Sequence, residues 1–380
     1  MQAGTIKQLA RECGFELAGV ARAEPLAADF ARYKAWADAG MAGRMGYLTD
    51  HRAEKRRDPR SLLPGAHSVI CVGKLYNVKA PANGSTVASE TPPDDATLSH
   101  YGTFSRYAWG GDYHDILHER LKQLAERIAQ HEPHQWKACV DTAPILERSY
   151  ARQAGLGWIG KNHCLINEPL GSWFFLGELL TSLAIVPDTP PADRCGSCTR
   201  CIDACPTQAI VPYEEAPYKE PLREDLGTRN QANAERASRY QIDARRCITY
   251  LNLELKGPIP EEFREAMGNN VIGCDICQDV CPWNRRAPST EDPAFAATAY
   301  DPAPPLETLA ALSKEQFEQQ YRNTPVTRPK YDGFLRNVAT AMGANPHERF
   351  REPLELLVRH ESPVVAGHAE WALRRLDERK

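Results

Sequence analysis

Eight of the twelve cysteines fall into two runs, and each run ends on Cys-Pro. In the first run, three cysteines recur at every third residue, and a fourth follows four residues after the third. This spacing is the bacterial ferredoxin pattern, in which the fourth cysteine binds the other [4Fe–4S] cluster. The two runs are Cys195, Cys198, Cys201, Cys205 and Pro206, and Cys247, Cys274, Cys277, Cys281 and Pro282.

This pattern predicts two [4Fe–4S] clusters with four cysteine ligands each. Three closely spaced cysteines can wrap one cluster in a tight loop. The cysteine before proline starts a new turn and points away, because proline has no N–H to donate back into the loop. We therefore expect Cys195, Cys198, Cys201 and Cys281 to bind one cluster, and Cys205, Cys247, Cys274 and Cys277 to bind the other.

Zinc sites and disulfides are the alternatives for these cysteines. Zinc sites usually pair two Cys-x2-Cys hairpins, which does not match four clustered cysteines followed by proline. Disulfides need an oxidising compartment, and no signal peptide or twin-arginine leader is visible. No apolar run reaches the roughly 18 residues that span a membrane. We therefore expect a cytoplasmic iron–sulfur protein, and its net charge of −4 restricts any nucleic-acid site to a local basic patch.

The 380 residues divide into three expected parts. Residues 1–185 alternate helix and strand signals, including a buried-strand pattern at 68–72 and helical spacing over 116–128, which predicts an α/β or α+β domain. Residues 186–290 hold the cysteine runs and predict a ferredoxin-like domain. Residues 300–380 are helical and resemble a single HEAT-like unit.

The helical unit at the C-terminus is expected to depend on the rest of the protein. Its apolar pattern is broken at Ser362-Pro363, which predicts a helix pair. A single repeat cannot bury its own apolar face, so the pair should pack on the preceding parts. Two polar segments, 79–100 and 211–239, are interpreted as a surface loop and a mobile insertion.

Asp141 is the most promising acid in the first part. Residues 137–140 predict a short strand, Thr142 can cap a following helix, and Pro144 suits its first turn. Asp141 is then expected where a strand ends and a helix begins, the usual place for ligand sites in open α/β sheets. A second helix cap or a surface acid is the alternative interpretation.

Five segments together resemble the epoxyqueuosine reductase family, in the same order and over nearly the whole chain. They are residues 106–114, 141–148, 157–162, 247–257 and 273–284. The resemblance implies a cobalamin-dependent enzyme that reduces epoxyqueuosine to queuosine at the wobble position of GUN-anticodon tRNAs. It also implies that an α/β (α+β) cobalamin-binding domain precedes the cluster domain and the helical, tRNA-contacting region.

The implied reaction removes one oxygen and consumes two electrons and two protons. Clusters deliver electrons singly, so the resemblance implies that Co(I) cobalamin attacks the epoxide as the two-electron nucleophile. The family's proton donor matches Asp141, and we expect burial near the corrinoid to raise its pKa. His114 begins an Asp-x-His-x-x-Gly motif, but Leu117 stands where glycine is required. We therefore expect base-off cobalamin and interpret His114 as a structural histidine.

The resemblance also implies corrinoid contacts from Arg57, Tyr107, Asp141, Lys161 and Asn162, although Arg57 and Lys161 are equally consistent with solvated charges. The implied partners are the tRNA anticodon arm and an external one-electron reductant such as flavodoxin or ferredoxin, with the protein acting as a monomer. Residues 322–380 carry 11 Lys and Arg against 8 Asp and Glu, and form the expected tRNA surface. An ordinary solvated helix face is the alternative.

Two other classes share parts of this pattern. Corrinoid iron–sulfur reductive dehalogenases combine cobalamin with two clusters, but they normally carry a twin-arginine leader. Asp141 within segment 141–148 also argues against that class. A simple electron-transfer module would need neither the long segment ahead of Cys195 nor a helical C-terminal unit.

Overall fold

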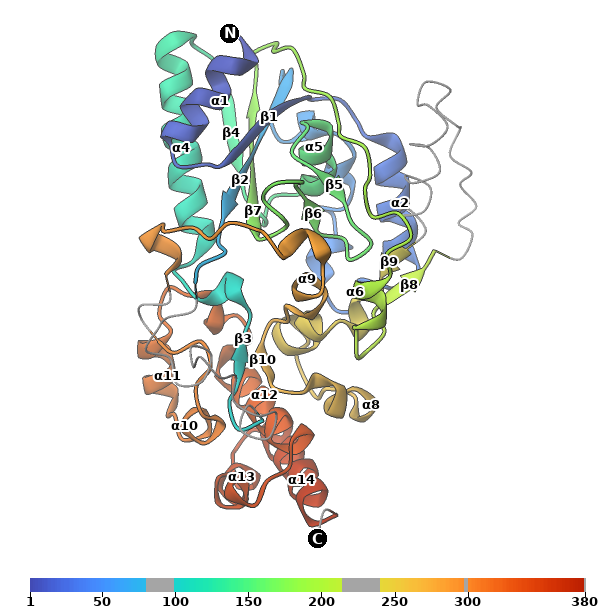
Figure 1. Ribbon diagram of the computed structural model, residues 1–380, viewed down its shortest axis with the longest axis vertical. Helices are drawn as coiled ribbons and strands as arrows, with labels where there is room; N and C mark the ends of the chain where they lie inside the picture. The colour runs from blue at the N-terminus through green and yellow to red at the C-terminus, as the bar shows by residue number, and fades with distance from the viewer. Residues whose placement is uncertain (80–98, 214–239, 297–299, 379–380) are drawn as a thin grey trace.

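The computed structural model describes residues 1–79, 99–213, 240–296 and 300–378. The segments interpreted as a surface loop and a mobile insertion lie largely outside these ranges. The N-terminal sheet lies at one end of the molecule and the C-terminal helices at the other, with the cysteine-bearing segments between them (Figure 1). Within the described ranges, no helix combines the length and apolar character needed to cross a membrane.

A four-stranded sheet forms the centre of the N-terminal part. The strands lie in the order β1-β2-β7-β4, and every neighbouring pair is antiparallel. The expected strand at 68–72 lies within β2, which is buried throughout. Because the sheet is antiparallel, this part is α+β, and the parallel-sheet rule used to place Asp141 does not apply. The strands are β1 (Leu17–Arg22), β2 (Ser68–Leu75), β4 (Trp136–Cys139) and β7 (Phe174–Thr181).

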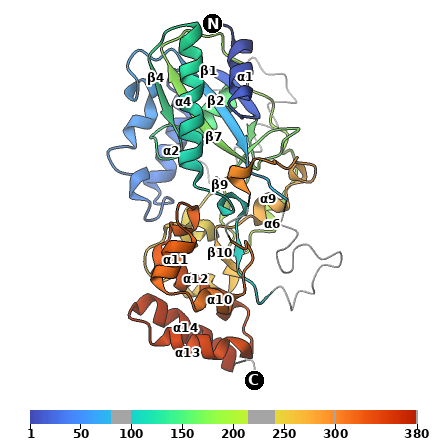
Figure 2. The same cartoon turned by 90° about the vertical axis from the view of Figure 1, so that its left-hand side faces the viewer.

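Helices cover both faces of this sheet (Figures 1 and 2). On one face, α1 and α4 pack their apolar stripes against the sheet. Leu117 of α4 and Val72 of β2, for example, belong to the same hydrophobic cluster. On the other face, α5 brings Tyr150 to Cys71. The helical spacing predicted over 116–128 is confirmed by α4. The helices of this part are α1 (Ala3–Glu12), α2 (Ala27–Asp38), α4 (Tyr113–His131) and α5 (Glu147–Gln153).

The cysteines lie on loops that connect short elements. The first run surrounds α6, the second run surrounds α9, and these two helices pack together. Two small antiparallel pairs, β5–β6 and β8–β9, flank the loops. The elements are β5 (Trp158–Ile159), β6 (Leu165–Ile166), α6 (Arg200–Asp203), β8 (Ile210–Pro212), β9 (Tyr240–Ile242), α8 (Glu261–Arg264) and α9 (Ile276–Asp279).

The C-terminal helices share one hydrophobic core with earlier segments. Phe334 of α12 packs with Phe104 of β3 and with Ile272 of β10, and these two strands pair in parallel. The helix pair predicted around Ser362-Pro363 is α13 and α14, and α14 packs on α12 as expected. The elements are β3 (Thr103–Phe104), β10 (Asn270–Ile272), α10 (Leu306–Ala310), α11 (Lys314–Gln320), α12 (Lys330–Ala344), α13 (Arg351–Val358) and α14 (Pro363–Asp377).

Arg336 on α12 holds the segment that follows Cys247. Its side chain is buried, and its guanidinium donates to the carbonyl oxygens of Leu251 at 2.9 Å, Leu255 at 2.6 Å and Gly257 at 2.8 Å. These carbonyls belong to, or directly follow, the π-helical turn Tyr250–Glu254. The C-terminal region therefore fixes the backbone next to a predicted cluster ligand.

Replacing Arg336 by Met should destabilise the fold by about 3 kcal/mol, because several buried carbonyl groups lose their donor at once. Urea-induced unfolding would measure the loss as a lower midpoint. Arg374→Met, on the exposed face of α14, is the matched control and should unfold like the parent protein. Equal midpoints for the two variants would contradict this role for Arg336.

Candidate functional site

Asp141 lies two residues after the end of β4, in a tight, strained turn. Its φ of 43° lies in the left-handed region, which a residue other than glycine adopts only under local constraint. The backbone N–H and the hydroxyl of Thr142 both donate to the Val140 carbonyl and close the turn. The prediction that Thr142 and Pro144 begin a helix is wrong, because α5 starts only at Glu147.

The Asp141 carboxylate meets two side chains from the first turn of α4. The Tyr113 hydroxyl donates to Oδ2 at 3.1 Å, and His114 Nε2 lies 3.1 Å from the same oxygen. The Asp141 side chain is nevertheless 46% exposed. Within the part of the chain that the structure describes, both of these side-chain contacts fall on Oδ2. Oδ1 can therefore meet a bound ligand.

His114 is held from its other side by Asp112. Its Nδ1 lies 2.7 Å from Asp112 Oδ1, and Asp112 also caps α4 by accepting the His114 N–H. Both ring nitrogens thus face carboxylates, which only accept hydrogen bonds when ionised, so both nitrogens carry protons. Burial lowers the pKa of His114, but the bonds to Asp112 and Asp141 outweigh it and raise the pKa to about 9.

The expected rise in the pKa of Asp141 is wrong for this arrangement. Burial raises the pKa, but hydrogen bonds from His114 and Tyr113 outweigh it. The positive charges of His114 and Arg328 act in the same direction, and the pKa of Asp141 falls below its usual value. At neutral pH, the proton of this pair is therefore held by His114 and not by Asp141.

Two further carboxyl groups lie behind Asp141. Glu147 Oε1 accepts the Asp141 N–H at 2.5 Å. Glu178, in the middle of β7, is 0% exposed, and neither of its carboxyl oxygens has a hydrogen-bond partner among the described residues. Burial and the charge of Asp141 raise the pKa of Glu147 to about 8. Burial and Glu147 also raise the pKa of Glu178, so both groups hold protons at neutral pH.

Polar groups from three other segments adjoin the acid. Arg328, which follows the short helical turn Pro325–Thr327, forms an ion pair with Glu254 at 2.7 Å. Its positive charge acts on Asp112 and Asp141. Glu254, Arg328 and Asp141 also act electrostatically on Tyr47, and burial followed by the charge of Glu254 raises the pKa of Tyr47 to about 12. The C-terminal region therefore contributes directly to this site.

Tyr107 is the predicted corrinoid contact that the structure brings nearest to Asp141. Its ring meets the Tyr113 ring edge-on with centroids 6.4 Å apart, and the Tyr113 ring stacks on Phe175 at 4.3 Å. Gly273 lies against Tyr107, since a Cβ at Gly273 would come within 2.9 Å of the Tyr107 Cε1 atom. An aromatic surface thus connects the acid with the loop that carries Cys274.

Arg57 does not join this group in the structure. Its side chain is 63% exposed and pairs with Glu54 at 3.0 Å. Its guanidinium lies over the Phe30 ring at 4.8 Å. These contacts match the solvated surface charge that the sequence left open as the alternative.

Lys161 and Asn162 meet the cysteine loops instead of Asp141. The buried Lys161 ammonium donates to the carbonyl oxygens of Gly196 at 2.9 Å and Cys198 at 2.8 Å. Asn162 Nδ2 donates to the Cys277 carbonyl at 3.3 Å. One adjacent pair of residues therefore fastens both cysteine loops to the β5–β6 hairpin. The corrinoid contact expected of Lys161 and Asn162 stays a prediction.

The eight cysteines of the two runs gather in adjoining groups. The thiols of Cys195, Cys198 and Cys281 all act electrostatically on Cys201, as does Cys277 from the neighbouring group. In the second group, Cys205 and Cys277 act on Cys247, and Cys247 and Cys277 act on Cys274. This grouping agrees with the predicted ligand sets, and the sets themselves stay a prediction.

Backbone N–H groups surround the cysteine sulfurs, which suits iron–sulfur ligation. The Ala209 N–H donates to Cys205 Sγ at 3.3 Å. The N–H groups of Thr249 and Tyr250 bond to the Cys247 sulfur. Such donors stabilise thiolate ligands and help to set the reduction potential of a cluster. Thiolate donors with this second layer of hydrogen bonds fit [4Fe–4S] clusters.

Several of the basic side chains counted in residues 322–380 are paired or buried, so the exposed positive surface is smaller than the residue count suggests. Arg349 pairs with Glu307, Arg351 with Asp377, and Arg336 is buried. These side chains hold the fold together. The part of residues 322–380 that could meet a polyanion is therefore narrower than the sequence suggested.

Known protein families match both the segment that contains the acid and the segment that contains the second cysteine run. The family model described as epoxyqueuosine reductase QueG, DUF1730 matches residues 56–142, which contain Asp112, His114 and Asp141. A second family model, described as a 4Fe-4S double cluster binding domain, matches residues 230–284. An epoxyqueuosine reductase from Xanthomonas campestris pv. campestris is 40% identical over 98% of this chain and 95% of the relative. The chain belongs to the epoxyqueuosine reductase family.

Solved structures of epoxyqueuosine reductases share this fold. One, in complex with a tRNA-Tyr epoxyqueuosine-modified stem loop, has a TM-score of 0.81 and 28% identity, and the match covers 98% of this chain and 89% of that chain. Another, from Bacillus subtilis with its catalytic aspartate loop swung out of the active site, has a TM-score of 0.79 and 28% identity over 98% and 90% of the two chains. The protein is therefore an enzyme of the epoxyqueuosine reductase family, which excludes a simple electron-transfer module.

Sequence reasoning missed several members of the site. His114 was interpreted as structural because it failed a cobalt-ligand motif, and Glu147 and Arg328 were not singled out for a role. Two of these three lie in segments that resemble the epoxyqueuosine reductase family, 106–114 and 141–148. The concentration of ionisable residues in those short segments was the available signal. Arg328 had no comparable local signal.

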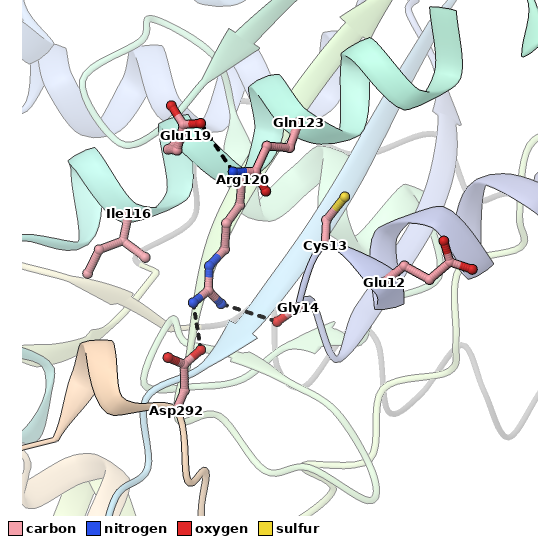
Figure 3. A pocket seen from close by; sticks show the side chains of 8 residues that line it. All are labelled: Glu12, Cys13, Gly14, Ile116, Glu119, Arg120, Gln123 and Asp292. Carbon is pink, nitrogen blue, oxygen red and sulfur yellow. Dashed lines mark hydrogen bonds and ion pairs between the residues drawn. The ribbon is translucent and has the colours of Figure 1, made fainter. Parts of the chain in front are cut away.

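A pocket of about 400 Å³ opens elsewhere, between α1 and α4 (Figure 3). Arg120 crosses it and pairs with Asp292 at 2.8 Å. The lining residues include neither Asp141 nor His114, so this pocket is separate from the candidate site of this family member.

Proposed function

We propose that this enzyme reduces epoxyqueuosine to queuosine at the wobble position of GUN-anticodon tRNAs. The observation that carries the proposal is the exposed Asp141 carboxylate, bonded to a histidine that Asp112 holds from behind. An epoxide becomes an alkene when its oxygen leaves as water, which consumes two electrons and two protons. The Asp141–His114 pair can supply a proton to that oxygen, and the clusters that the cysteine groups would hold can relay electrons from an external carrier.

Two [4Fe–4S] clusters and cobalamin are the proposed cofactors. Cobalamin, when bound, would supply a metal centre that collects two electrons one at a time and then acts as a nucleophile. The aromatic surface of Tyr107 and Tyr113 beside Asp141 suits the apolar face of a corrin ring. We retain Tyr107 and Asp141 as its contacts. The loop of Cys274 adjoins Tyr107, which favours the second cluster as the one nearer to the substrate.

The proton path is proposed to run from His114 through Asp141. His114 holds the proton at neutral pH, and its Nε2 faces Asp141 Oδ2. When negative charge develops on the substrate oxygen, the His114 proton can move to the Asp141 carboxylate, which then donates it to that oxygen. Asp112 stabilises the charged imidazole in the resting state. Asp141 thus donates without needing a raised pKa of its own.

The rate of reduction should fall as the pH rises through about 9, where His114 loses its proton. The raised pKa of His114 means that the proton is retained throughout the neutral range and is lost only on the alkaline side. His114→Gln should lower the rate about 10- to 100-fold and remove this alkaline fall, because glutamine does not titrate. Single-turnover rates across the pH range test this, and an unchanged alkaline fall in the variant would reject His114 as the proton source.

Each of the three parts of the chain is proposed to have its own role. Residues 1–185 form the cobalamin-binding catalytic part, 186–290 the two-cluster part, and 300–380 the helical region that contacts tRNA. A tRNA anticodon arm is the macromolecular substrate, in line with the stem loop bound by a family member. We propose that the protein acts as a cytoplasmic monomer and receives electrons from a carrier such as flavodoxin or ferredoxin.

Substrate choice tests the proposal against a reductive dehalogenase. One reconstituted, reduced preparation with cobalamin would be offered, anaerobically and in parallel, tRNA carrying epoxyqueuosine and a chlorinated phenol. We expect conversion of the tRNA base alone. Dechlorination without any change in the tRNA would reject the proposed function and favour the dehalogenase.

A further inference from the structure

We infer that Glu147 is a positioning residue that latches the Asp141 turn in its working conformation. This inference rests on the proposed function, since it concerns the same acid. Glu147 is the first residue of α5, and its Oε1 accepts the backbone N–H of Asp141 at 2.5 Å. This bond involves the Asp141 backbone and not Oδ2, the atom that faces both His114 and Tyr113. Its action on the reaction is therefore indirect, through the backbone of Asp141.

The turn needs such a latch because its backbone is strained. Asp141 has a φ of 43°, and a residue other than glycine persists there only where surrounding contacts enforce it. The Thr142 bonds to the Val140 carbonyl close one side of the turn. On the other side, the Asp141 N–H reaches Glu147, six residues later. Without this acceptor, the turn can relax and carry the carboxylate away from His114.

Glu178 is a second buried carboxyl group close to the latch. It lies on β7 directly opposite Cys139 of β4, two residues before Asp141, and the charges of Glu147 and Asp141 act on it. The other charged groups that act on Glu147 are Arg148 and His114. Because burial and the charge of Asp141 keep Glu147 protonated near neutral pH, its carbonyl oxygen is the acceptor that the Asp141 N–H meets.

Two substitutions separate this role from a charge effect. Glu147→Ala removes the acceptor, whereas Glu147→Gln retains a carbonyl oxygen of the same shape as a neutral carboxyl group. We expect Glu147→Ala to lower kcat about 10- to 100-fold with little change in KM, because relaxation of one strained residue is worth one to two powers of ten. Glu147→Gln should recover most of that loss. Glu126→Ala, an exposed acid on α4, is the control.

Hydrogen exchange provides a readout that does not depend on turnover. The peptide covering residues 137–146 should exchange faster in Glu147→Ala than in the parent protein, while Glu147→Gln and Glu126→Ala stay protected. Unchanged protection and unchanged kcat in Glu147→Ala would overturn the latch, as would a Glu147→Gln variant as impaired as Glu147→Ala. Failure of the parent enzyme itself to reduce epoxyqueuosine would count against the proposed function and leave the exchange result to decide the latch.

Discussion

Replacing Asp141 by Asn should lower the rate of epoxyqueuosine reduction by about 10²- to 10⁴-fold, the usual contribution of a positioned acid. Asparagine keeps the size of the side chain and can still accept from Tyr113, but it cannot take a proton from His114 and pass it on. The effect should appear in kcat, because tRNA binding does not depend on this proton. Single-turnover conversion, read by mass spectrometry of the nucleosides, measures it.

Asp115→Asn is the matched control for this experiment. Asp115 is an exposed acid one residue beyond His114 on the same helix, and its replacement should leave the rate unchanged. Cluster content and tRNA affinity should equal those of the parent protein in both variants. An Asp141→Asn enzyme that turns over at the parent rate would remove Asp141 from the reaction and leave His114 as the only proton donor in the account.

Replacing Cys281 by Ala should abolish turnover and remove about half of the bound iron, because one of two four-iron clusters loses a ligand. Cys281 is the last cysteine of the second run but is predicted to bind with Cys195, Cys198 and Cys201. The variant should therefore lose the first cluster and keep the second. Iron analysis and electron paramagnetic resonance of the reduced protein distinguish the two clusters.

A reciprocal variant tests whether the last cysteine of each run binds the cluster of the other run. Cys205→Ala lies in the first run but should remove the second cluster and leave the first. Cys13→Ala, a buried cysteine outside both runs, should retain all the iron and the full rate. If Cys281→Ala and Cys205→Ala each lost the cluster of their own run, the crossed ligand sets would be wrong.

Features set by local spacing were predictable from the sequence. Cysteine spacing predicts two clusters and their ligand sets, and these sets stay a prediction although the structure brings the same residues into adjoining groups. Helical periodicity predicted α4, and the break at Ser362-Pro363 predicted α13 and α14 because proline fits the first turn of a helix but not its interior. The strand before Asp141 was also correct, since four residues of strand pattern ended at a turn.

Features set by long-range packing were not predictable. Whether β2, β4 and β7 pair in parallel or antiparallel depends on contacts between distant segments, so the class of sheet stayed open. Asp141 was expected to have a raised pKa because burial alone was considered. The opposing effect comes from His114, which is distant in sequence and is brought close only by α4. The shared core of β3, β10 and α12 likewise joins segments that composition separated at residues 186 and 300.

The most direct test of the account is complementation of a bacterial strain that lacks its own epoxyqueuosine reductase and accumulates epoxyqueuosine in its tRNA. Expression of this chain should convert the modified nucleoside to queuosine, with the loss of one oxygen seen by mass spectrometry, and the Asp141→Asn variant should leave epoxyqueuosine in place. Persistence of epoxyqueuosine in cells whose purified protein carries both clusters and cobalamin would contradict the proposed function.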